Sequence, residues 1–88
     1  MFGNNSDQAV SSAREFVRAL KKRIATNEKK RDALKDNMGS LRWDARSDRE
    51  AAEKLDATRR EYTATLARIG RDNALLRQME AWIREATK

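Results

Sequence analysis

The chain has 88 residues, of which 39% are charged and 6% aromatic, and its net charge at neutral pH is +6. It has no cysteine and no histidine, which excludes disulfides, thiolate or imidazole metal ligands and the commonest general base near neutral pH. It also lacks a glycine-rich phosphate loop and any apolar run near the ~20 residues that span a bilayer, so we expect no enzyme, cofactor, metal site or membrane span.

The first helix is predicted from about residue 6 to residue 38. Asn5 with Gln8 has the spacing of a capping box, in which each side chain bonds the free backbone amide of the other residue. Gly39 is the best internal stop, because glycine readily takes the left-handed conformation that closes a helix. The opening residues lack the features of a cleaved export signal, so we expect a cytoplasmic protein, or one inside a virus particle if the chain is phage-derived.

A connector is predicted over residues 39–47, followed by a second helix over residues 48–86. Ser47 and Glu50 have capping-box spacing and mark the start of that helix. No sequence signal divides the chain, so we expect one helical domain over residues 1–88.

The connector carries an aromatic side chain between two arginines, Arg42, Trp43 and Arg46, at the predicted tip of a hairpin. Such a tip docks into a partner's pocket, stacks on an unpaired base, or only covers the end of the hairpin, and these alternatives stay open. Trp43 in a helical turn resembles the WXG-type secreted hairpin proteins in shape only, because Ala45 stands where that family has glycine.

One heptad frame runs through both predicted helices, and most of its a and d positions are apolar, as in coiled coils. The a positions are Val10, Val17, Ile24, Arg31, Met38, Ala45, Ala52, Arg59, Leu66, Asn73 and Glu80. The d positions are Ala13, Leu20, Asn27, Leu34, Leu41, Asp48, Leu55, Tyr62, Ile69, Leu76 and Ile83. The frame predicts an all-α protein.

The preferred fold is a long antiparallel hairpin that turns about Trp43. Opposite residue numbers then sum to 86, which places Val17 opposite Ile69 and Asn27 opposite Arg59. The alternative is one long helix in a parallel coiled coil. That arrangement stacks residues such as Arg59 on their own like charge, so the hairpin is favoured.

The end of the second helix is apolar over a face wider than one partner helix covers, which predicts an interface between copies or with another protein. The candidate interface residues are Phe16, Leu75, Met79, Trp82 and Ile83. Two helices share only a narrow seam, so we expect self-association into a helical bundle. The other interpretation is that these residues only close the open end of the hairpin.

The first helix is rich in basic side chains, which either contact phosphates or form a solvated coiled-coil surface. The candidate nucleic-acid contacts are Arg18, Lys21, Lys22, Arg23, Lys29, Lys30 and Arg31. The sequence therefore predicts a coiled-coil assembly protein that acts as an adaptor, scaffold or accessory subunit. In size and charge it is similar to small basic scaffolding proteins of bacteriophages. The alternative function is sequence-independent binding of nucleic acid.

Overall fold

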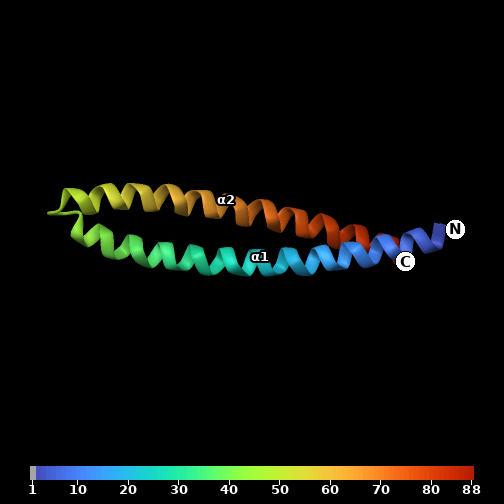
Figure 1. Ribbon diagram of the computed structural model, residues 1–88. Coiled ribbons are helices and arrows are strands. Elements are labelled where there is room, and N and C mark those ends of the chain that lie inside the picture. The colour runs from blue at the N-terminus through green and yellow to red at the C-terminus, as the bar shows by residue number, and fades with distance from the viewer. Residues whose placement is uncertain (1) are drawn as a thin grey trace.

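A computed structural model describes the backbone of residues 2–88 and the side chains of residues 7–88. Helix α1 (Phe2–Asp44) and helix α2 (Arg49–Ala86) lie antiparallel and in contact, and the N-terminal end of α1 extends past the end of α2 (Figure 1). They form a rod 69 Å long and about 15 Å across. The all-α hairpin is therefore confirmed, and the alternative of one long helix is wrong. Among the described residues, neither helix has a stretch apolar enough to cross a membrane.

The first helix is longer than predicted at both ends. It continues through Gly39 to Asp44, so the residues predicted as the start of the connector are helical. Gly39 does not have a positive φ angle, and it therefore does not close the helix. Met38 is buried beside it and Leu41 is half-buried, so packing on α2 holds this turn of helix in place despite the low helix propensity of glycine.

The turn between the helices is short and well hydrogen-bonded. The backbone amide of Ala45 donates to the carbonyl of Leu41 at 2.8 Å, and that of Asp48 donates to the carbonyl of Asp44 at 3.1 Å. Asp48 has extended backbone angles, and its carboxylate accepts the backbone N–H of Glu50 at 3.0 Å. The cap of α2 is therefore Asp48, one residue later than the predicted Ser47 cap.

The buried stripe of α1 follows the predicted frame. Its buried side chains occupy a and d positions, namely Val10, Ala13, Val17, Leu20, Ile24 and Met38. Asn27, Arg31 and Leu34 continue the same stripe as half-buried residues through the middle of the helix. The 3-4 spacing thus predicts which side of α1 faces α2.

The buried stripe of α2 departs from that frame. Leu55 and Ile69 are buried at d positions, as predicted. The a positions turn away from the seam, because Arg59 is exposed and Leu66 is 41% exposed. The g positions, each one residue before an a position, face α1 in their place, and Thr65 at one of these g positions is fully buried. This rotation keeps the charge of Arg59 in water, where it has no desolvation cost.

The polar residues in this stripe have hydrogen-bond partners. The hydroxyl of Thr65 donates to the carbonyl of Glu61, one turn earlier in α2, at 2.8 Å. Asp72, also at a g position, accepts two hydrogen bonds from Arg23 of α1. Among the described residues no buried side-chain nitrogen or oxygen lacks a partner, so the seam accepts polar groups without an unsatisfied donor or acceptor.

The register of the hairpin differs from the prediction. The turn occupies residues 45–48, so opposite residue numbers sum to about 93. Two ion pairs between the helices agree with this register, Arg23 with Asp72 at 2.8 Å and Lys30 with Glu61 at 2.9 Å. The predicted register, with a sum of 86, is wrong by one heptad, because the chain turns after Asp44 and not about Trp43.

Candidate functional site

An apolar surface lies where the chain ends of the two helices meet. It is a shallow depression of about 480 Å³, which we call the apolar shelf, lined by Ala9, Ser12, Ala13, Phe16, Met79 and Trp82. Phe16 is 43% exposed and Trp82 is 44% exposed. Helix α1 contributes three small residues and Phe16, and helix α2 contributes Met79 and Trp82. The shelf is therefore a contiguous apolar area open to solvent.

The structure brings together three of the five predicted interface residues: Phe16, Met79 and Trp82. Leu75 is half-buried and lines a different cleft, one helical turn further from the chain ends. Ile83 is half-buried at a d position, on the stripe of α2 that faces α1. Sequence analysis missed Ala9 and Ser12, because small residues on a solvated side of a helix carry no hydrophobic signal.

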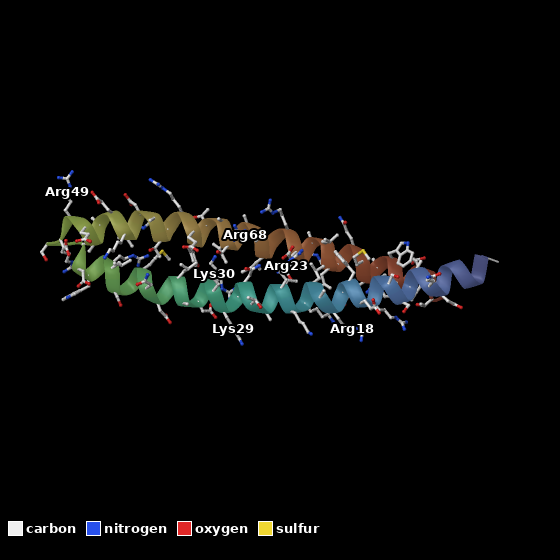
Figure 2. All side chains as sticks on the ribbon, viewed as in Figure 1. Arg18, Arg23, Lys29, Lys30, Arg49 and Arg68 are labelled. Atoms are coloured by element: carbon white, nitrogen blue, oxygen red, sulfur yellow. The ribbon has the colours of Figure 1, made fainter. Side chains whose placement is uncertain are left out.

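A second concave site lies next to the shelf, on the line between the helices. We call it the arginine cleft; its volume is about 370 Å³ and its lining residues are Arg23, Asn27, Arg68, Arg71, Asp72 and Leu75. Figure 2 shows Arg23 of α1 and Arg68 of α2 extending into the space between the two ribbons. Three arginines and one aspartate give the cleft two excess positive charges. The pairing of the helices brings Arg23 and Asn27 of α1 to the four lining residues of α2.

Asp72 is held by a bidentate interaction inside this cleft. Arg23 donates from Nε to Oδ2 at 2.9 Å and from Nη2 to Oδ1 at 2.8 Å. These hydrogen bonds lower the pKa of Asp72; its burial acts in the opposite direction, and the positive charges of Arg23 and Arg71 lower it further. The two-point contact also fixes the plane of the Arg23 guanidinium group.

Acidic pH is expected to weaken the hairpin through Asp72. The carboxylate has a lower pKa in the folded chain than in the unfolded chain, so it stabilises the fold above the unfolded pKa. That stabilising contribution is lost as the pH falls through the pKa that Asp72 has in the folded chain. Urea denaturation between about pH 2 and pH 5 should therefore show a smaller loss of stability for Asp72→Asn than for the wild type. Asp36→Asn, which removes an exposed carboxylate from α1, is the control for the loss of one negative charge. Identical slopes of the unfolding free energy against pH for the wild type and Asp72→Asn contradict the expectation.

The seven predicted phosphate contacts fall into two groups. Four of them form ion pairs within the chain: Lys21 with Glu80 at 3.9 Å, Arg23 with Asp72 at 2.8 Å, Lys30 with Glu61 at 2.9 Å, and Arg31 with Asp32 at 3.0 Å. Arg18, Lys22 and Lys29 have no ion pair among the described residues, and their spacing of four and seven places them on one face of α1. Figure 2 shows Arg18 and Lys29 pointing away from α2.

The hairpin tip presents its aromatic side chain to solvent. Trp43 is 70% exposed, and the guanidinium carbon of Arg46 lies 4.9 Å from the centre of its ring, in a cation–π contact. Arg42 is exposed at the end of α1. Because most of Trp43 stays in water, it gives the end of the hairpin little cover.

No protein-family model matches this chain, and no curated protein or solved structure matches it either. Among the described residues, no group of three acidic side chains is placed to hold a metal ion. The candidate functional features of the described residues are the apolar shelf at the chain ends, the arginine cleft beside it and the exposed tip.

Proposed function

We propose that this protein is a non-enzymatic assembly protein whose hairpins associate with one another through the apolar shelf. The observation that carries the proposal is the exposure of Phe16 and Trp82 on one contiguous apolar surface. The described residues form two helices, and neither of them covers this surface. A second copy presents the same surface and can bury it in a symmetric contact.

The shelf supports an association of modest strength. An aromatic side chain has roughly 200 Å² of surface, so covering the exposed part of Phe16 or Trp82 removes roughly 80 Å² from water. At ~25 cal/mol per Å² this contributes about 2 kcal/mol for each aromatic, or about 8 kcal/mol for two copies. Association costs ~4–15 kcal/mol, which is comparable to this gain. The dimer therefore depends on burial of the aromatic side chains, and we expect it to form at high local concentration of the protein.

The arginine cleft favours one orientation of the two copies. If two hairpins lay side by side in the same direction, each cleft, with two excess positive charges, would face the other cleft. Like charges in such a contact repel and cost free energy. Hairpins that overlap in opposite directions at the shelf keep their clefts apart. This arrangement leaves the tip of each rod, with Trp43, free at the far end for another protein, as an adaptor or scaffold requires.

The combined substitution Met79→Ala and Trp82→Ala is expected to weaken self-association by at least about tenfold, because it removes the α2 half of the shelf. Sedimentation equilibrium over a range of protein concentrations measures the effect. Trp43→Ala is the control, since it removes an exposed indole from the opposite end of the rod and should leave association unchanged. A wild-type chain that stays monomeric at millimolar concentration contradicts the proposal, as does unchanged association of the shelf variant.

A further inference from the structure

Positive charge is concentrated in one part of the rod. Residues 14–31 of α1 carry eight basic and two acidic side chains, and residues 59–77 of α2 carry five basic and two acidic side chains. Together these segments have a net charge of +9, while the whole chain has +6, so all other residues sum to −3. We call the two segments the basic belt.

The fold places these two segments side by side. In the observed register, opposite residue numbers sum to about 93, so residues 14–31 lie alongside residues 62–79, which include most of residues 59–77. The ion pairs of Arg23 with Asp72 and of Lys30 with Glu61 join them directly. At a rise of 1.5 Å per residue the belt is about 27 Å long. The excess charge therefore lies on the central part of the rod, away from the exposed tip.

We propose that the basic belt binds the phosphodiester backbone of duplex DNA, with the arginine cleft as its central contact. Arg68 and Arg71 line the cleft and have no ion pair among the described residues. Arg23 is oriented by Asp72 and brings a third guanidinium group to the same place. The planar fork of arginine donors fits phosphate oxygens, and the single carboxylate leaves two positive charges unbalanced.

The cleft is suited to a backbone and not to unpaired bases. Stacking on single strands requires exposed aromatic side chains beside the basic groups. Phe16, the exposed aromatic side chain of the belt, lines the apolar shelf and not the cleft. Tyr62 is half-buried on the seam, and no aromatic residue lines the cleft. Trp43 lies at the tip, outside the belt. The contact is therefore electrostatic and independent of base sequence, and it is expected to weaken steeply with salt.

The test compares two variants that each remove two positive charges. Arg68→Gln with Arg71→Gln changes the cleft, and Arg42→Gln with Arg49→Gln changes exposed arginines near the tip; glutamine retains helix propensity at all four positions. Fluorescence anisotropy of a labelled 20-base-pair duplex is recorded at about 50, 100 and 200 mM salt. The cleft variant should bind at least about tenfold more weakly, and its slope of log K against log salt should be less steep by about 1.8. The tip variant should bind like the wild type.

Three outcomes overturn the proposal: no binding by the wild type at the lowest salt, equal weakening by the two variants, or tighter binding of a single strand than of the duplex. Circular dichroism of both variants is the control that checks whether they keep the helical fold. Chemical-shift mapping of the wild-type chain with the same duplex needs no substitution. Shifts centred on Arg23, Arg68 and Arg71 support the assignment, and shifts confined to the tip contradict it.

Discussion

Replacing Leu20 with alanine is expected to destabilise the hairpin by about 2–5 kcal/mol. Leu20 is 2% exposed, in the middle of the buried stripe of α1. The substitution removes buried methyl groups and leaves a cavity that two long, stiff helices cannot easily close. Small folded chains have only ~5–15 kcal/mol of stability, so a large share is lost.

Leu66→Ala is the matched control, because it is the same chemical change on α2. The heptad frame places Leu66 at an a position, as if it were a core residue, whereas the structure leaves it 41% exposed. We expect its substitution to cost less than about 1 kcal/mol. Urea denaturation followed by circular dichroism, at one low protein concentration, measures both variants. Equal losses for the two leucines would show that α2 faces α1 with the a and d positions of the continuous frame.

Changing both Gly39 and Gly70 to alanine is expected to stabilise the hairpin by about 1.5–2 kcal/mol. Both glycines are exposed within helices, neither has a positive φ angle, and an added Cβ at either site meets no atom within 4 Å. Alanine restricts the unfolded chain and favours a helix by about 1 kcal/mol over glycine. For a chain of this length the melting temperature should rise by roughly 6–16 °C.

Gly39→Ala alone also distinguishes the two positions of the turn. If the chain turned at Gly39, the glycine would have a left-handed conformation and alanine would lower the melting temperature. In the observed fold α1 continues to Asp44, so alanine should raise it. Thermal denaturation of the single variants shows whether the melting temperature rises or falls. Gly70→Ala provides the reference for a glycine inside a helix.

Local sequence signals account well for α1 and for the existence of α2. Val10, Val17 and Ile24 occupy a positions of the predicted frame, and all three are buried. The start of α2 is predicted to within one residue, since Asp48 caps it in place of Ser47. These features depend on residues close together in the chain, where 3-4 spacing and side-chain capping act directly.

The arrangement of one helix on the other is harder to predict. Moving the turn from Gly39 or Trp43 to residues 45–48 shifts the register by whole heptads, and each such shift preserves the alternation of apolar positions. The burial of Thr65 and the exposure of Arg59 depend on how α2 is rotated about its axis. A frame counted through the turn holds no information on that rotation, because the turn residues are not helical.

The sequence by itself determined two amphipathic helices, a break between them, a high density of charge and an excess of exposed apolar residues near the chain ends, since periodicity and composition are local properties. Only the tertiary structure decided which residues meet. It placed Phe16 beside Met79 and Trp82, and it joined Arg23 to Asp72 in the cleft that Arg68 and Arg71 also line. These neighbours are far apart in the chain, and their meeting depends on the register and rotation of α2, which the short turn and the cost of burying unpaired charge set together.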